Sequence, residues 1–233
     1  MSAPLILLPG WGLGAAALQP LAEALGPRVQ IAPLPRLATA RVDDWLDALD
    51  RCLPRDAWLV GWSLGGMLAS LLAARRGAGC PGLITCASNV RFVAASSWPQ
   101  AMLVETFTAF REAYGANPSV TLKRFAMLCS QGAVEPKALS RQLQGVVDGS
   151  DSSTGLELLG QLDTLSALRS FAGPQLHLFA GADGLVPVQV ADAVQDALAD
   201  ACVQVIAQAS HAMVVEQVDQ VAERIRHFME AHS

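Results

Sequence analysis

The chain has 233 residues, of which 52% are hydrophobic and 16% are charged, and its formal net charge is −5. That composition is too apolar for a disordered chain, and the length suffices for one sizeable hydrophobic core. The acidic balance disfavours a general nucleic-acid-binding protein, which needs an excess of Lys and Arg to neutralise phosphates. We therefore expect a globular protein with no nucleic acid among its partners. We also expect it to be a monomer.

No segment is predicted to enter or cross a membrane. The apolar runs, such as Leu5–Leu8, end in Pro and Gly after a few residues, whereas a spanning helix needs roughly 20 residues. The N-terminus has no basic stretch followed by an apolar core, so we expect no secretory signal. The five cysteines are scattered and include no C-x-x-C pair, which disfavours a disulfide framework or a metal site. We expect a cytoplasmic protein that needs no metal or cofactor.

Short apolar runs and amphipathic segments alternate along most of the chain. The runs predict strands buried on both faces, over residues 4–9, 29–34, 57–60, 82–87, 175–180 and 202–206. Apolar residues at helical spacing predict helices, over residues 15–25, 42–53, 65–74, 187–198 and 214–231. Such alternation indicates an α/β fold, with a mostly parallel central sheet and helices on both faces.

The rhythm changes between residues 89 and 161. Strand-like runs disappear there, and helix-compatible segments follow one another over residues 98–112, 120–128 and 136–147. We interpret this stretch as a helical lid at the carboxyl edge of the sheet. The chain then divides into a core of residues 1–88 and 162–233, and an inserted lid of residues 89–161.

The segment Gly61–Gly65, Gly-Trp-Ser-Leu-Gly, matches G-x-S-x-G between a predicted strand and a predicted helix. In this strand-turn-helix elbow a serine occupies a strained, exposed turn, and the glycines avoid collisions with neighbouring backbone. The context, together with Gly66, favours a nucleophile over a merely structural turn. The sequence thus predicts the α/β-hydrolase fold, with Ser63 as nucleophile and the Leu64 amide directed at the developing oxyanion.

A serine nucleophile needs a base, which is usually a histidine. Of the four histidines, His177 lies within a predicted strand, His227 in the last predicted helix and His232 next to the end of the chain. His211 lies in a small-residue loop after the last predicted strand, where it can reach the carboxyl edge of the sheet. His211 is therefore the predicted base, and the alternative for it is an ordinary surface histidine.

The carboxylate that orients the base follows the serine and precedes the histidine in this fold. Asp183 comes directly after the strand predicted over residues 175–180, which places it at the same edge of the sheet. Its alternative role is to cap the helix that follows. The competing carboxylates lie in or near the insertion or within the next helix: Asp148, Asp151, Asp163, Asp192 and Asp196.

A second oxyanion donor is expected from the loop after the first strand. Residues 9–12, Pro-Gly-Trp-Gly, occupy that place, and the Trp11 amide is the candidate donor. The Trp11 indole either lines the acyl pocket or packs in the core, and both roles are compatible with donation by its amide.

Several segments resemble the carboxylesterase family of biotin synthesis that cleaves the methyl ester of pimeloyl-[acyl-carrier protein]. They are residues 7–13, 61–66, 87–92, 98–99, 124–125, 155–159, 184–187 and 210–212. Together they span nearly the whole chain, and Trp62 and the Trp98-Pro99 pair are the most discriminating among them. The chain departs from the family at Pro9, where a His is usual, and over residues 35–41, which lack a Pro-Gly-x-Gly turn.

The resemblance implies a serine carboxylesterase that forms an acyl-enzyme on Ser63. It also implies that the acyl chain contacts Trp11, Leu64 and the stretch Phe125, Ala126, Met127, Leu128 and Cys129. Basic lid residues, namely Arg124, Lys137 and Arg141, would receive an acidic acyl-carrier protein. Charge adds an independent hint, because residues 111–141 hold five basic and two acidic side chains, a net charge of +3 in an acidic chain. An ordinary solvated helix face explains the same charges.

Four alternatives share the predicted fold. A broad short-chain carboxylesterase and a carbon–carbon bond hydrolase use the same triad. A haloalkane dehalogenase is disfavoured, since Asp would replace Ser63. A ligand-binding receptor without turnover is disfavoured by the complete set of Ser63, Asp183 and His211.

Overall fold

The computed structural model describes residues 3–148 and 152–232. Six strands of these residues form one parallel sheet, in the order β2-β1-β3-β4-β5-β6. The strands are β1 (Leu5–Leu8), β2 (Val29–Ile31), β3 (Trp58–Trp62), β4 (Leu83–Cys86), β5 (Gln175–Ala180) and β6 (Cys202–Ile206). Each lies within or close to a predicted run, so the α/β prediction is confirmed.

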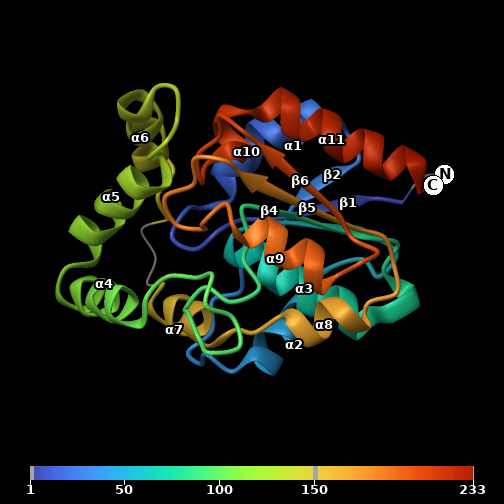
Figure 1. The fold of residues 1–233 in the computed structure, drawn as a ribbon, viewed down its shortest axis with the longest axis horizontal. Coiled ribbons are helices and arrows are strands. Elements are labelled where there is room, and N and C mark those ends of the chain that lie inside the picture. Colours follow the sequence, from blue (N-terminus) through green and yellow to red (C-terminus); the bar gives the residue numbers. More distant parts are fainter. Residues whose placement is uncertain (1–2, 149–151, 233) are drawn as a thin grey trace.

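Helices cover both faces of the sheet (Figure 1). One layer contains α1 (Gln19–Leu25), α10 (Met213–Glu216) and α11 (Val218–Ala231). The other contains α2 (Val42–Cys52), α3 (Leu64–Arg76), α8 (Leu165–Ser170) and α9 (Val190–Ala197). Short 3₁₀ turns precede α1 (Ala15–Leu18) and follow α3 (Gly77–Gly79). None of the helices described is both long and apolar enough to span a bilayer.

Burial explains why the strand sequences are apolar without alternation. Every residue of β1, β3, β4 and β5 is buried, whereas the edge strands β2 and β6 are partly exposed. A central parallel strand is covered by a helix layer on each face, so both faces select apolar side chains. The edge strand β2 ends at Ile31, three residues earlier than predicted, and prolines at 33 and 35 lack the N–H that a ladder needs.

Four helices between β4 and β5 form the inserted segment: α4 (Val104–Ala116), α5 (Pro118–Cys129), α6 (Pro136–Gly145) and α7 (Ser153–Gln161). In Figure 1, α4, α5 and α6 stand beside the sheet on the left, while α7 lies closer to the core. Helix α5 begins with Pro at its first position, and the Asn117 side chain accepts a hydrogen bond from the Val120 amide at 3.1 Å. This combination is a strong helix start.

The predicted start of the first inserted helix was wrong by six residues. The helix begins at Val104 rather than Trp98, because Trp98 belongs to a turn. Its backbone pairs with Ala95, and its buried indole donates to Asn89 Oδ1 at 2.8 Å. Pro99 follows directly, and a residue before proline disfavours helical backbone.

His177 is a core residue of β5, as predicted, with 3% of its surface exposed. Its Nδ1 lies 2.8 Å from Oγ1 of Thr85, its neighbour on β4. Its Nε2 has no hydrogen-bond partner among the described residues. Burial lowers the pKa of His177 from 6.5 to about 4, because a charged imidazole is poorly solvated there.

The free energy of unfolding is expected to fall as the pH drops from about 6.5 to 4. In this window the unfolded chain binds a proton at His177 and the folded chain does not, which destabilises the fold by up to roughly 3 kcal/mol. His177→Asn should flatten this part of the pH profile in urea denaturation, whatever its absolute stability. Equal slopes for wild type and His177→Asn would contradict this account.

Candidate active site

Ser63 lies in the turn between β3 and α3, as the motif predicts. Its backbone angles, φ 53° and ψ −120°, belong to a region that L-residues rarely adopt. Hydrogen bonds hold this conformation: the Ser63 amide donates to the Cys86 carbonyl at 3.0 Å, and the Ser63 carbonyl accepts from the Gly66 amide and the Ser88 hydroxyl at 2.9 Å each. The strained turn is therefore supported by β4 and by the start of α3.

Two glycines make the turn sterically feasible. A Cβ at Gly61 would lie 2.2 Å from the Gly65 carbonyl oxygen, and a Cβ at Gly65 would lie 2.3 Å from the Leu8 carbonyl oxygen. Neither position can accept a side chain without moving backbone. The requirement explains why the motif has glycine at both ends.

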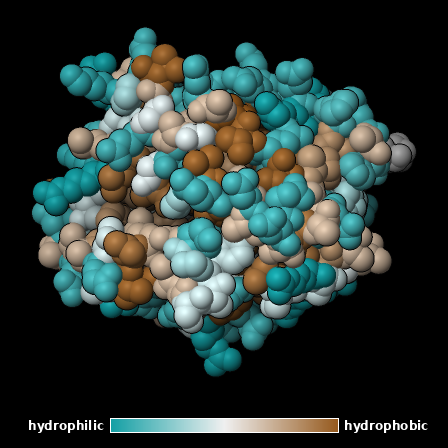
Figure 2. All heavy atoms as spheres, viewed as in Figure 1, coloured by the Kyte–Doolittle hydropathy of each residue, from teal (hydrophilic) through white to brown (hydrophobic). Residues whose placement is uncertain are grey.

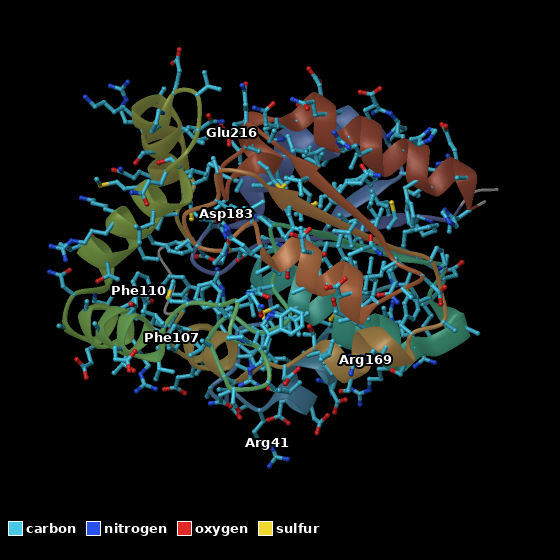
Figure 3. The ribbon with its side chains drawn as sticks, in the orientation of Figure 1. Arg41, Phe107, Phe110, Arg169, Asp183 and Glu216 are labelled. Atoms are coloured by element: carbon cyan, nitrogen blue, oxygen red, sulfur yellow. The ribbon has the colours of Figure 1, made fainter. Side chains whose placement is uncertain are left out.

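The loops after β5 and β6 bring Asp183 and His211 to Ser63. His211 Nε2 lies 3.0 Å from Ser63 Oγ, and His211 Nδ1 lies 2.9 and 3.1 Å from the two Asp183 carboxylate oxygens. The side chains of His211 and Asp183 are each only 1% exposed, so this hydrogen-bonded chain is shielded from water. Figure 3 places Asp183 at the boundary between the inserted helices and the sheet.

Asp183 is held by two main-chain donors. Its Oδ1 accepts hydrogen bonds from the amides of Leu185 and Val186 at 2.8 and 2.9 Å. These amides belong to the loop before α9, which begins only at Val190, so Asp183 does not cap that helix. The arrangement orients the carboxylate toward His211.

The competing carboxylates lie in other surroundings. Asp148 pairs with Arg36 at 3.3 Å and Asp163 with Arg91 at 2.7 Å. Asp192 and Asp196 are exposed on α9, and Asp151 lies outside the described residues. Of the other histidines, His227 and His232 are exposed. The structure thus brings together the three residues that the sequence selected.

The loop that carries His211 is anchored on both sides of the histidine. The Ser210 amide donates to the Glu216 carboxylate, and Ser210 is fully buried. The Ala212 amide donates to the carbonyl of Cys129, the last residue of α5, at 3.2 Å. Glu216 is labelled in Figure 3. No local sequence pattern predicts these supports, because they join residues of separate elements.

Both predicted oxyanion donors lie in segments that adjoin Ser63. Leu64 is the first residue of α3, where an N–H has no carbonyl of its own helix to bind and the helix dipole favours negative charge. The loop of residues 9–12 passes close by, since a Cβ at Gly10 would lie 3.4 Å from Ser63 Cβ. Their role as donors stays a prediction.

The Trp11 indole packs into the inserted helices. It is 2% exposed, and its N–H donates to the Ser152 carbonyl at 2.7 Å. Aromatic rings meet it edge-on at 5.0–5.6 Å, namely those of Phe110, Tyr114 and Phe125. Trp11 also lines an apolar cavity of about 50 Å³, together with Phe92, Met102, Thr106, Phe110, Phe125, Leu128, Leu156, Leu159 and Leu185. Packing and lining therefore occur together, and Phe110 is labelled beside this region in Figure 3.

The stretch from Phe125 to Cys129 is divided among three environments. Phe125 and Leu128 line the apolar cavity. Met127 is 59% exposed and lines an open groove outside it. Ala126 and Cys129 are fully buried and line neither hollow, and burial raises the pKa of the Cys129 thiol well above 9.0. Leu64 lines a different hollow, of about 60 Å³, which Trp11 also lines.

The open groove, of about 750 Å³, lies between α5 and α6. Its apolar floor includes Met127, Leu128 and Pro136, and three exposed cations line it: Arg124, Lys137 and Arg141. Within the described part of the chain, none of these cations forms an ion pair. Figure 2 shows apolar side chains at the surface on the left, where Figure 1 places the inserted helices. The groove therefore offers unpaired positive charge around an apolar floor.

Comparisons with known proteins agree with this geometry. The model of the Alpha/beta hydrolase family matches residues 5–224. The Biotin biosynthesis bifunctional protein BioHC of Cellvibrio japonicus is 35% identical over 97% of this chain, which spans only 47% of that longer relative. The Pimeloyl-[acyl-carrier protein] methyl ester esterase of Shewanella sp. (strain MR-7) is 32% identical, over 95% of this chain and 88% of its own.

Among solved structures, a bromoperoxidase from Bacillus anthracis superposes with a TM-score of 0.84 at 15% identity, covering 99% of this chain and 92% of its own. That likeness concerns the fold. The family match along the chain and the relatives at 32–35% identity lead to one assignment. The chain belongs to the alpha/beta hydrolase family and, within it, to the pimeloyl-[acyl-carrier protein] methyl ester esterases.

Proposed function

We propose that this chain is a serine carboxylesterase that hydrolyses the methyl ester of pimeloyl-[acyl-carrier protein] in biotin biosynthesis. The observation that carries the chemistry is the buried hydrogen-bonded chain from Ser63 Oγ through His211 to Asp183. The substrate rests on the relatives of that name, of which one is 32% identical over 95% of this chain. We further propose that the protein works as a monomer in the cytoplasm.

Acylation begins with the Ser63 proton. His211 Nε2, 3.0 Å away, accepts it as Ser63 Oγ attacks the ester carbonyl carbon. Asp183 stabilises the imidazolium that forms. The amides of Leu64 and Trp11 stabilise the tetrahedral oxyanion, and each such donor is worth about 3–4 kcal/mol. When the intermediate collapses, the bond to the methoxy oxygen breaks, His211 returns its proton to that oxygen and methanol leaves.

Deacylation repeats these steps with water. His211 takes a proton from a water molecule as the water oxygen attacks the acyl carbon. The amides of Leu64 and Trp11 stabilise the second oxyanion. The bond from the acyl carbon to Ser63 Oγ then breaks, and His211 gives its proton to Ser63. The products are the free carboxylate of the acyl chain and the restored enzyme.

The inserted helices are proposed to act as the lid, over residues 89–161, on a core of residues 1–88 and 162–233. The apolar cavity beside Trp11 suits a hydrocarbon chain, because it is lined almost entirely by carbon. The groove between α5 and α6 suits an acidic carrier protein, because Arg124, Lys137 and Arg141 present unpaired positive charge there. Leu128 lines both hollows, so carrier and acyl chain would meet at one residue.

The triple variant Arg124→Glu, Lys137→Glu, Arg141→Glu tests the carrier site. We expect kcat/KM for the carrier-linked methyl ester to fall roughly 10- to 100-fold, since three attractive charges become repulsive. Hydrolysis of a small free ester, p-nitrophenyl butyrate, should change less than about twofold, as rim charges act mainly on association. Mass spectrometry of the carrier protein and absorbance of p-nitrophenol measure the two rates.

Lys123→Glu is the matched control, because Lys123 is an exposed cation of α5 that does not line the groove. It should affect neither substrate. Equal losses on both substrates in the triple variant would exclude this groove as the carrier site. A wild-type enzyme that leaves the carrier-linked ester intact while cleaving the free ester would overturn the proposed substrate.

The small volume of the apolar cavity, about 50 Å³, favours a second candidate, a broad short-chain carboxylesterase. That enzyme would cleave acetyl and butyryl esters fastest and would gain nothing from a carrier protein. A series of p-nitrophenyl esters from two to eight carbons separates the candidates, together with a growth test in a biotin-requiring strain that lacks this esterase.

A further inference from the structure

Trp62 is the residue before the nucleophile and the last residue of β3. Its side chain is buried, with 2% of the residue exposed. The indole N–H donates a hydrogen bond to the main-chain carbonyl of His211 at 2.8 Å, and the two ring centres lie 6.0 Å apart. Trp62, next to the nucleophile, thus binds His211, the proposed base for Ser63. His211 lies 148 positions after Ser63 in the sequence.

The same indole also lies beside the loop of the first strand. A Cβ at Gly10 would lie 3.5 Å from Cε3 of Trp62 and 3.4 Å from Cβ of Ser63. The Gly10 backbone therefore passes over both residues. Trp62 is in this way bonded to the nucleophile, hydrogen-bonded to the base and packed against the loop of the proposed second oxyanion donor.

The loop that carries His211, here called the base loop, has two other supports, and both bind the residues on either side of His211. The Ser210 amide binds Glu216, and the Ala212 amide binds the Cys129 carbonyl. Trp62 binds His211 itself. Trp62 is the last residue of β3 and directly precedes Ser63. Its hydrogen bond therefore fixes the position of the base relative to the nucleophile.

We propose that Trp62 is a positioning residue for catalysis, whose indole N–H sets the distance between His211 Nε2 and Ser63 Oγ. The inference rests on the proposed serine-esterase chemistry. Without the N–H, the buried carbonyl of His211 loses a partner, and the loop relaxes toward other donors. A misplacement of about 1 Å in a reacting group can cost roughly 10²-fold in rate, so a small shift of His211 is sufficient for a large effect.

A buried tryptophan can also serve only to fill the core, and the chain offers a matched case of that role. Trp58 lies at the other end of β3, is 4% exposed and packs edge-on against Phe228 at 6.0 Å. Trp58→Phe therefore removes a buried indole from the same strand without touching the base loop. Its comparison with Trp62→Phe separates positioning from packing.

The first experiment compares Trp62→Phe and Trp58→Phe with p-nitrophenyl butyrate. We expect Trp62→Phe to lower kcat about 10- to 100-fold with KM within about twofold, and Trp58→Phe to keep kcat within about twofold, even where the two melting temperatures fall equally. The rate at which a fluorophosphonate probe labels Ser63 should follow kcat, since it also requires the base. A near-normal kcat in Trp62→Phe, or equal kcat losses in both variants, would overturn the proposal.

The second experiment isolates the hydrogen bond. Benzothienylalanine at position 62 keeps the shape of the indole and replaces its N–H by sulfur, so the fold is preserved. We expect kcat to fall at least about fivefold, the factor that corresponds to loss of one ordinary hydrogen bond. An unchanged kcat would exclude the hydrogen bond as the positioning contact. Failure of the serine-esterase mechanism is distinguishable from both outcomes, because it would appear as retained turnover in Ser63→Ala.

Discussion

Ser63→Ala is expected to lower kcat for ester hydrolysis by about 10⁶-fold, the loss seen when a triad serine is removed. Ser63 Oγ is the atom that His211 activates, at 3.0 Å, and alanine offers no oxygen to attack the ester. The fold should persist, since the main-chain hydrogen bonds of residue 63 to Cys86, Gly66 and Ser88 do not involve the Ser63 hydroxyl. The measurements are steady-state rates with p-nitrophenyl butyrate, the burst of acyl-enzyme, and its mass.

Ser70→Ala provides the control for that experiment. Ser70 is a buried serine of α3 whose hydroxyl donates to the Gly66 carbonyl at 2.8 Å. Its loss should leave the rate within about twofold, because a hydroxyl that bonds within its own helix contributes little to the site. Turnover that survives in Ser63→Ala, in protein free of wild-type contamination, would end the serine-esterase proposal.

Asp183→Asn is expected to lower kcat by about 10⁴-fold, as in other Ser-His-Asp triads. The amides of Leu185 and Val186 both donate to Oδ1, so the oxygen of an asparagine is held at that position. Its NH₂ group must then occupy the place of Oδ2, which faces His211 Nδ1 at 2.9 Å. His211 Nδ1 then accepts a hydrogen bond from this NH₂ group, so the imidazole proton moves to Nε2. In that tautomer the imidazole can no longer take the proton of Ser63.

The control for Asp183→Asn is Asp163→Asn, which breaks a surface ion pair with Arg91 and should leave activity unchanged. The rate of Ser63 labelling by a fluorophosphonate should fall together with kcat in Asp183→Asn, because both need the same tautomer. A variant that keeps more than a tenth of the wild-type kcat would show that another group orients His211.

The residues that local patterns could identify are those tied to strand ends. Gly61, Ser63 and Gly65 follow from steric rules within one turn, and Asp183 follows from its place after a buried strand. His211 follows from the small number of histidines and the carboxyl edges that parallel strands share. These inferences need only the order of elements, so the sequence suffices for them.

The remaining features depend on contacts between distant segments. The indole of Trp62 reaches His211 across the fold, and no periodicity in either segment reports that contact. Leu128 lines two hollows at once, which depends on how α5 packs. The helix predicted from Trp98 begins later because its indole binds Asn89. Tertiary packing and tertiary hydrogen bonds determine these features, and neither leaves a local pattern in the sequence.

The hydrogen bond from the Ala212 amide to the Cys129 carbonyl also bears on how such an enzyme diversifies. The carboxyl end of α5 thus contacts the loop that carries His211. The turn at Gly132, which follows α5, packs against Ala182 in the loop that carries Asp183. Substitutions at this end of α5 are therefore expected to change the rate of turnover. Among the described residues, no hydrogen bond joins helix α4 or α6 to these two loops, so selection can exchange the exposed surfaces of these helices for new substrates while the chemistry stays constant. A directed-evolution library aimed at new esters is best placed on those two helices.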